Sequence, residues 1–296
     1  MEIQKANMHS HKEEIVPDPF LMKGMEKALE RIVKAVNERE KIVIYGCYDV
    51  DSITAISLLM LVSKYLNADV EYFVSNNIDD KFDINSYEVK NYIKLLGTKL
   101  IVTVGCGMNS ISQVELCRRL GIDVIITDYH KCKDTLPDTV VVNPNQKGCN
   151  YPFKDLAAVG VAFKLSQAIS MYYQMRYISK YLDLVTLGTV FHGVNLYGEN
   201  RIMVEEGLSH FNCTNNYGLK ALLKVYNINS IDLFNIYNLA QNIISSMKCK
   251  RTVDNARIAV ELFTTSSMDR AEQIAKYLKN ETLGSENMLY KSFLKY

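Results

Sequence analysis

The apolar residues of this chain alternate between short continuous runs and longer stretches with helical spacing. Runs rich in β-branched residues predict five strands, at 41–46, 70–74, 99–104, 123–127 and 139–143. Segments with helical spacing precede or separate them, and they predict helices over 22–36, 53–66, 86–96 and 111–120. Continuous apolar strands that alternate with helices indicate an α/β fold with a doubly wound parallel sheet.

The second half of the chain changes to a mainly helical pattern. A long helix is predicted over 156–175, and residues after 200 show helical spacing most clearly at 218–223 and 256–262. We therefore expect three parts, which are a mobile lead-in over 1–17, an α/β domain over 18–200 and a helical extension over 201–296. His9 and His11 of the lead-in are expected to be exposed to solvent rather than to bind metal.

Composition narrows the class of protein. The 296 residues are 48% hydrophobic and 23% charged, which suffices for one large domain or two smaller ones. The net charge of +1 gives no global basic signal, so nucleic-acid contact would need a local patch, and the densest basic cluster is 248–251. Seven cysteines without a CxxC pair, no signal peptide and no membrane-length apolar run predict a cytoplasmic protein with reduced thiols.

Polar clusters follow four of the predicted strands. Because the carboxyl ends of parallel strands meet at one edge of a sheet, these clusters should converge there. They are Asp49/Asp51, Gly105-Cys106-Gly107, Asp128-Tyr129-His130 and Asn143-Pro144-Asn145. Asp49 and Asp51 are candidates for binding a divalent cation, since hard cations prefer several oxygen ligands.

Several segments, in order, resemble the DHH phosphoesterase superfamily, and within it the catalytic half of RecJ-type single-strand-specific DNA exonucleases. They are Ile44-Tyr-Gly-Cys-Tyr-Asp-Val-Asp51, Asp123-Val-Ile-Ile-Thr-Asp-Tyr-His130, Val142-Asn-Pro-Asn145, Val159-Gly-Val-Ala-Phe-Lys164 and Gly198-Glu-Asn-Arg-Ile202. The resemblance implies hydrolysis of single-stranded DNA by two Mn²⁺ or Mg²⁺ ions, one activating water and both clamping the reacting oxygens.

The family's ligands are only partly present. Cys47 replaces a motif aspartate, Gly105 replaces the aspartate that bridges the metals, Tyr129 replaces a ligating histidine, and His192 aligns with a ligating aspartate. Tyr129 is a poor substitute because a phenol with a pKa near ~10 must lose its proton to bind a hard cation well. The loss of three expected ligands, at 105, 129 and 192, predicts that the two-metal site is abolished.

Four family side chains remain. Asp49 and Asp51 are the residual metal ligands, and Asp128 and His130 are the residual catalytic residues. His130 corresponds to a histidine that lies near the scissile phosphate in the family, so it is expected either to contact a phosphate or to cap its loop. Asp128 is expected to orient its neighbours rather than to bind metal directly.

Other roles for these positions stay open. Cys47, Cys106, His130 and His192 together would suit Zn²⁺, and Cys47 precedes a helix, where a thiol can become nucleophilic. Candidate phosphate contacts are Asn143, Lys164 and Arg201. The alternative for Lys164 and Arg201 is simple solvation, which is usual for lone basic residues on helices.

Three functions are consistent with this pattern. The first is a catalytically impaired RecJ-like protein with weak binding of single-stranded DNA, an oligonucleotide or a protein partner. The second is an active Mn²⁺- or Mg²⁺-dependent 5′-to-3′ phosphodiesterase, and the third is a non-enzymatic interaction module. The helix over 268–279 resembles the start of the linker to the family's second domain, and single-strand affinity is expected to be low without that domain.

Overall fold

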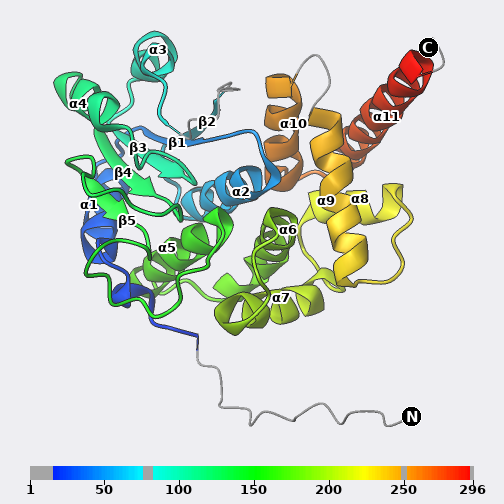
Figure 1. Cartoon of the computed structure of the whole chain (residues 1–296), viewed down its shortest axis with the longest axis horizontal. Helices are drawn as coiled ribbons and strands as arrows, with labels where there is room; N and C mark the ends of the chain where they lie inside the picture. The colour runs from blue at the N-terminus through cyan, green and yellow to red at the C-terminus, as the bar shows by residue number, and fades with distance from the viewer. Residues whose placement is uncertain (1–15, 76–82, 248–251, 294–296) are drawn as a thin grey trace.

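A five-stranded parallel sheet forms the centre of the first half of the protein. The computed structural model describes residues 16–75, 83–247 and 252–293, so most of the predicted lead-in and the basic cluster at 248–251 lie outside it. The strand order is β2-β1-β3-β4-β5 (Figure 1). The strands are β1 (Ile42–Gly46), β2 (Val70–Val74), β3 (Leu100–Val104), β4 (Asp123–Thr127) and β5 (Val140–Val142). The predicted doubly wound parallel sheet is confirmed.

The strands are aligned so that their carboxyl ends share one edge. Gly46 at the end of β1 pairs with Val74 and Val104, and Val104 pairs with Thr127. The polar clusters that follow β1, β3, β4 and β5 are therefore brought to the same edge, as the strand pattern predicts.

Helices cover both faces of the sheet because successive strand side chains point to opposite sides. Ile42 and Ile44 belong to one buried apolar cluster, and Val43 and Tyr45 belong to the other. The helices that follow or precede the strands are α1 (Met25–Asn37), α2 (Val50–Tyr65), α3 (Ser86–Glu88), α4 (Ile111–Arg119) and α5 (Ala158–Tyr172).

Helix α2 is buried over most of its length. Every residue from Val50 to Met60 is buried. The hydroxyls of Thr54 and Ser57 donate to carbonyl oxygens within the preceding turn, at 2.9 and 2.7 Å, so these buried polar groups are satisfied. A Cβ at Gly188, in the helix Leu182–His192, would lie 3.3 Å from the Cα of Asp51. Glycine at this position therefore permits that helix to approach α2 closely.

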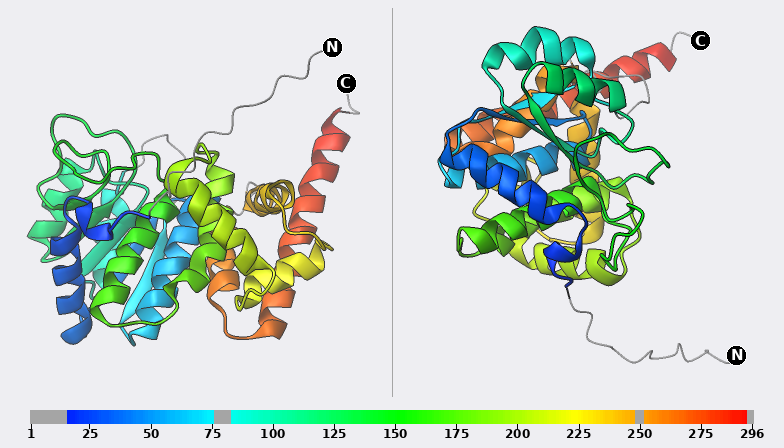
Figure 2. Two further views of the ribbon diagram at one scale, coloured as in Figure 1. Left: turned by 90° about the horizontal axis from the view of Figure 1, so that it is seen from below. Right: turned by 90° about the vertical axis from the view of Figure 1, so that its left-hand side faces the viewer.

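The remaining helices pack on the side of α2 away from the sheet (Figures 1 and 2). They are α6 (Leu182–His192), α7 (Gly198–Phe211), α8 (Tyr217–Val225), α9 (Leu233–Met247), α10 (Thr252–Thr264) and α11 (Met268–Phe293). One cluster of buried apolar side chains extends from Met22 through α2 to Leu278. The core therefore continues across residue 200 without interruption.

Short helical turns complete the chain. They are η1 (Pro19–Leu21), η2 (Val89–Ile93), η3 (Lys94–Leu96) and η4 (Ile178–Tyr181). The regular helix predicted over 86–96 is instead an α turn, a π-helix and a 3₁₀ turn in succession, and it ends at Gly97 with a positive φ of 75°. Among the described residues, no helix is long and apolar enough to cross a membrane.

Candidate functional site

Asp49 caps the first turn of α2. Its Oδ1 accepts a hydrogen bond from the backbone N–H of Ser52, and its Oδ2 accepts one from the Ser52 hydroxyl, both at 2.8 Å. This is the ordinary N-cap role of aspartate, extended by the serine side chain. Both oxygens of a predicted metal ligand therefore already have protein donors.

Asp51 lies in the first turn of α2 and is almost completely buried, at 2% exposure. Its carboxylate accepts hydrogen bonds from the backbone N–H groups of Ala158 and Val159 at 2.9 and 2.8 Å, at the beginning of α5. The Nδ1 of His192, at the end of α6, lies 3.3 Å from its Oδ2. Burial, together with the charge of Asp49, raises the pKa of Asp51 to about 8. Asp51 therefore ties three helices together.

The loop after β4 holds an ordered carboxylate–imidazole pair. Oδ1 of Asp128 lies 2.7 Å from Nδ1 of His130 and also accepts the backbone N–H groups of Tyr129 and His130. The buried Oδ2 of Asp128 makes no hydrogen bond to any residue that the structure describes. Burial lowers the pKa of His130, but the hydrogen bond and charge of Asp128 outweigh it, so this pKa is raised. Asp128 thus fixes the His130 ring and favours its charged form.

Tyr129 fills the space between two imidazoles. Its ring stacks on His130 with the centroids 4.2 Å apart, and it meets His192 edge-on at 4.7 Å. Burial raises the pKa of the Tyr129 phenol, and the charges of Asp51 and Asp49 raise it further. The side chain is therefore a neutral phenol held by aromatic contacts.

Gly105 follows β3 with a φ of +66°, which favours glycine. A Cβ at this position would lie 2.9 Å from the Cβ of Ala158 and 3.5 Å from the hydroxyl oxygen of Ser52. Ala158 therefore closes the space into which a side chain at 105 would extend.

Two cysteines meet at the ends of the neighbouring strands β1 and β3. Cys47 is half-buried and Cys106 is buried, and both belong to the same apolar cluster. A hydrogen bond with the Cys47 thiol, together with burial, raises the pKa of Cys106 well above its ordinary value. Within residues 16–75, 83–247 and 252–293, no three His, Cys, Asp or Glu side chains are placed to hold a metal ion. The zinc set of Cys47, Cys106, His130 and His192, which the sequence left open, is therefore not assembled among these residues.

Residues 41–189, half of the chain, match the family model described as the DHH family, N-terminal domain. The chain belongs to the DHH family. It is 36% identical over 259 residues to the single-stranded-DNA-specific exonuclease RecJ of Bacillus subtilis (strain 168), covering 87% of this chain and 32% of that protein. It is 38% identical over 220 residues to RecJ of Escherichia coli (strain K12), covering 70% of this chain and 38% of that protein.

Solved structures agree on the fold. The structure of exonuclease RecJ bound to manganese superposes with a TM-score of 0.82 at 24% identity, covering 95% of this chain and 69% of that one. RecJ from Thermus thermophilus in complex with Mn²⁺ gives a TM-score of 0.79 at 24% identity, covering 93% of this chain and 39% of that one. The chain spans only 32% and 38% of the lengths of the Bacillus and Escherichia RecJ proteins.

The predicted phosphate contacts of this DHH-family chain are engaged with protein groups. The Asn143 amide donates to the carbonyl oxygen of His130 at 2.9 Å and accepts from the backbone N–H of Asn145 at 2.7 Å, which joins two edge loops. Arg201 lies on α7, with its Nε 3.9 Å from the carboxylate of Glu205.

The expectation that Lys164 is either solvated or in contact with phosphate is wrong. Its side chain is fully buried, and its Nζ lies 2.9 Å from Oε1 of Glu199 and donates to the carbonyl oxygen of Pro17 at 2.7 Å. The Tyr151 hydroxyl donates to the other Glu199 oxygen at 2.6 Å. The clue in the sequence is a lysine within the apolar stretch 156–169, where a buried cation requires a carboxylate partner.

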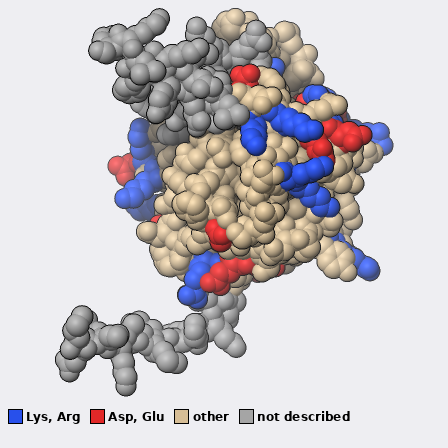
Figure 3. Space-filling model, turned by 90° about the vertical axis from the view of Figure 1, so that its right-hand side faces the viewer, with Lys and Arg blue, Asp and Glu red and all other residues tan. Residues whose placement is uncertain are grey.

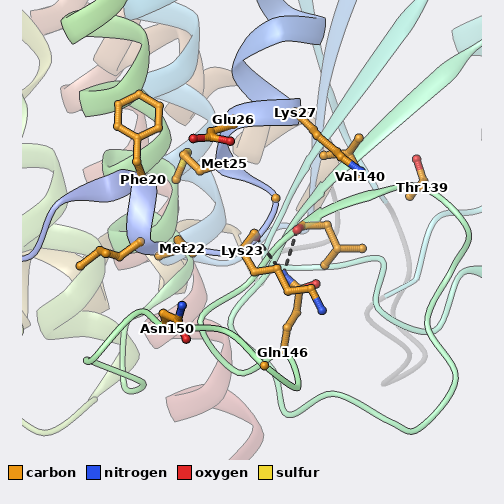
Figure 4. A pocket seen from close by; sticks show the side chains of 14 residues that line it. Phe20, Met22, Lys23, Met25, Glu26, Lys27, Thr139, Val140, Gln146 and Asn150 are labelled. Atoms are coloured by element: carbon orange, nitrogen blue, oxygen red, sulfur yellow. Dashed lines mark hydrogen bonds between the residues drawn. The ribbon is translucent and has the colours of Figure 1, made fainter.

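A pocket of about 510 Å³ lies beside β5, lined by η1, the start of α1 and residues 146–150 (Figure 4). Gln146 donates to the carbonyl oxygens of Lys23 and Val141 at 3.0 and 2.9 Å beneath it. None of the predicted site residues lines this pocket. The Asp and His cluster is therefore separate from it.

Proposed function

We propose that this DHH-family protein binds single-stranded DNA or short oligonucleotides weakly at the carboxyl edge of its sheet and does not hydrolyse them by the two-metal chemistry of its family. The observation that carries the proposal is the Asp51 carboxylate, whose two oxygens accept the first backbone N–H groups of α5. A carboxylate that closes a helix end serves the protein rather than a metal ion.

The surrounding residues support the same reading, because they do not fit a two-metal centre. Gly105 supplies no bridging carboxylate, and Ala158 occupies the space beside it. Tyr129 is a neutral phenol, and Asp49 is a helix cap. Mn²⁺ and Mg²⁺ prefer several converging oxygen ligands, and this edge offers few uncommitted ones.

Binding without hydrolysis is best supported by His130. Its raised pKa favours the positively charged form of the ring, and Asp128 fixes the direction of that ring. The N-terminus of α5, which the fold would otherwise offer to an anion, is already occupied by Asp51. His130 is therefore the favoured contact for a phosphate.

Surface charge is consistent with weak binding. On the face shown in Figure 3, Lys and Arg side chains lie among Asp and Glu in the part that is not covered by grey. In the helical region Lys224 pairs with Glu272, and Arg270 pairs with Glu261, each at 2.6 Å. Such paired cations contribute little to attraction of a polyanion.

The experiment is Mn²⁺ titration by calorimetry beside digestion of a 5′-labelled single-stranded oligonucleotide, with a RecJ relative as the positive control. We expect oligonucleotide binding without cleavage. Mn²⁺-dependent cleavage that is lost in Asp51→Ala would contradict the proposal and support an active phosphodiesterase. Absence of both binding and cleavage would support a protein-interaction module instead.

A further inference from the structure

Four aromatic rings form a continuous series from the sheet to the surface. Tyr45 of β1 stacks on Phe73 of β2 with ring centroids 5.9 Å apart and planes 3° from parallel. Phe73 stacks on Tyr92 at 6.0 Å, and Tyr92 meets Tyr87 edge-on at 6.0 Å. Tyr45 is fully buried, whereas Tyr92 and Tyr87 are 50% and 63% exposed. The series therefore ends in two open rings.

A rare helical geometry places these two open rings together. Tyr92 lies in the π-helix η2, and Tyr87 lies in the α turn just before it. Residues five apart face each other in π geometry, and these tyrosines are five apart. Short π segments are uncommon and occur often at functional sites.

The rings are held firmly from beneath. The Tyr45 hydroxyl donates to the buried carboxylate of Glu88 at 2.6 Å and accepts the backbone N–H of Asn85 at 3.1 Å. Asn85 in turn caps α3 by accepting the backbone N–H of Tyr87 at 2.8 Å. A ring pair that is already ordered loses little conformational freedom when it binds a ligand.

Two lysines are close to the open rings along the chain. Lys90 lies two residues before Tyr92 in η2, Lys94 lies two residues after it at the start of η3, and both are exposed. Neither makes an ion pair with another described residue, in contrast to Lys41 and Lys224. The acid of this segment, Glu88, is buried and accepts hydrogen bonds from Tyr45 and Ser75.

We propose that Tyr87 and Tyr92 form a stacking platform for unpaired bases of single-stranded DNA, with Lys90 and Lys94 beside the phosphate backbone. Bases stack on aromatic side chains without sequence preference, and nearby cations follow the backbone. The proposal rests on the function proposed above. It places a base-binding site at the carboxyl end of β2, where the Ser75 N–H donates to the carbonyl oxygen of Gly46, three residues before Asp49.

The test compares two probes by fluorescence anisotropy, a short labelled oligothymidylate and an abasic oligonucleotide of the same length. The native protein is expected to bind the oligothymidylate more tightly. Tyr92→Ala is expected to weaken oligothymidylate binding about tenfold, and Tyr87→Ala by a similar factor, with little change for the abasic probe. Tyr92→Phe keeps the ring and should retain binding.

The matched control is Tyr65→Ala. Tyr65 is also well exposed, but it lies at the C-terminal end of α2, whereas Asp49 and Asp51 lie at the start of that helix. Circular dichroism melting of each variant separates lost binding from lost folding. Equal affinity of native protein and a folded Tyr87→Ala/Tyr92→Ala variant would overturn the platform alone. Failure of the native protein to bind either probe would overturn the platform together with the proposed function.

Discussion

The carboxylate of Asp51 accepts a hydrogen bond from the backbone N–H of Val159 at 2.8 Å, which joins the start of α2 to the start of α5. The neighbouring N–H of Ala158 donates to the other oxygen at 2.9 Å. Asp51, which the family resemblance marks as a metal ligand, therefore links two helices in this protein and should contribute to the stability of the fold.

Asp51→Ala is expected to destabilise the protein by about 2–5 kcal/mol, because two buried N–H groups lose their acceptor. Asp49→Ala removes only an N-cap and is expected to cost about 1 kcal/mol. Urea unfolding in metal-free buffer measures both. A stabilised Asp51→Ala variant would contradict the structural role, since relief of carboxylate repulsion is what a metal site without its metal would show.

Gly105 and Ala158 are expected to be energetically coupled. Gly105→Ala should be strongly destabilising, because its Cβ would lie 2.9 Å from that of Ala158. In an Ala158→Gly background the same change should cost less, by about 1 kcal/mol. A double-mutant cycle of unfolding free energies measures this coupling, and additive effects would show that Ala158 does not close the space.

Gly105→Asp alone is expected not to create a Mn²⁺ site, because Ala158 occupies the space that the new side chain needs. The combined Gly105→Asp/Ala158→Gly variant should bind Mn²⁺ more tightly than either single variant, because only it offers both the carboxylate and room for it. Calorimetric titration measures the difference. Equal affinities of the single and double variants would show that other missing ligands decide metal binding.

Lys164→Met is expected to destabilise the protein by about 3–5 kcal/mol, since it leaves the buried charge of Glu199 without its partner. Lys164→Met combined with Glu199→Gln should be more stable than Lys164→Met. Affinity for an oligonucleotide should stay unchanged in every folded variant. A selective loss of oligonucleotide binding would restore Lys164 as a phosphate contact.

Asp183 gives a pH dependence of stability. Burial raises its pKa from 3.8 to about 6, against the lowering effect of its hydrogen bond from Thr214. The folded state therefore holds a proton that the unfolded state has lost, and stability falls as pH rises from about 4 to about 6, by about 3 kcal/mol. Buried Asp51, whose pKa is also raised, contributes its own fall over this range. Asp183→Asn, which can keep hydrogen bonds to both Leu184 and Thr214, should therefore show a smaller fall than the native protein rather than none. Urea unfolding across that pH range, compared between the two proteins, measures it.

Oligonucleotide affinity should also depend on pH through His130. The pKa of His130 is raised because the hydrogen bond and charge of Asp128 outweigh its burial, so the charged ring persists to a higher pH than in an unperturbed histidine. Affinity is expected to fall as pH rises through this pKa and to lose that dependence in His130→Gln. Anisotropy titrations at several pH values test this, and a parallel slope in both proteins would assign the effect elsewhere.

Much of the sheet could be predicted from the sequence because its signals are local. Runs such as 99–104 carry β-branched residues and end at glycine or polar clusters, and the parallel order places those clusters at one edge. The mixed helical geometry over 86–96 could not be predicted, since apolar spacing does not distinguish an α turn from a π turn. The stacking of Tyr92 on Phe73 depends on a strand paired in space rather than on spacing.

The candidate site was predictable in its members but not in their roles. Four polar loops at one edge follow from strand pattern alone. Whether Asp51 binds an ion or a helix end depends on where α5 begins, more than 100 residues later. The burial of Lys164 likewise depends on Glu199 of another helix, a contact that one sequence does not reveal.

Helix α2 has almost no surface toward water over its first eleven residues, from Val50 to Met60. The sheet on one side and α6 and α10 on the other pack against the same helix, so an altered side chain there disturbs both. Exposed positions of the edge loops, such as Lys131 and Lys133, are not constrained in this way. Tolerance to mutation should therefore be higher at these positions than along α2, which would allow the exposed chemistry of this edge to change while the scaffold beneath it is preserved.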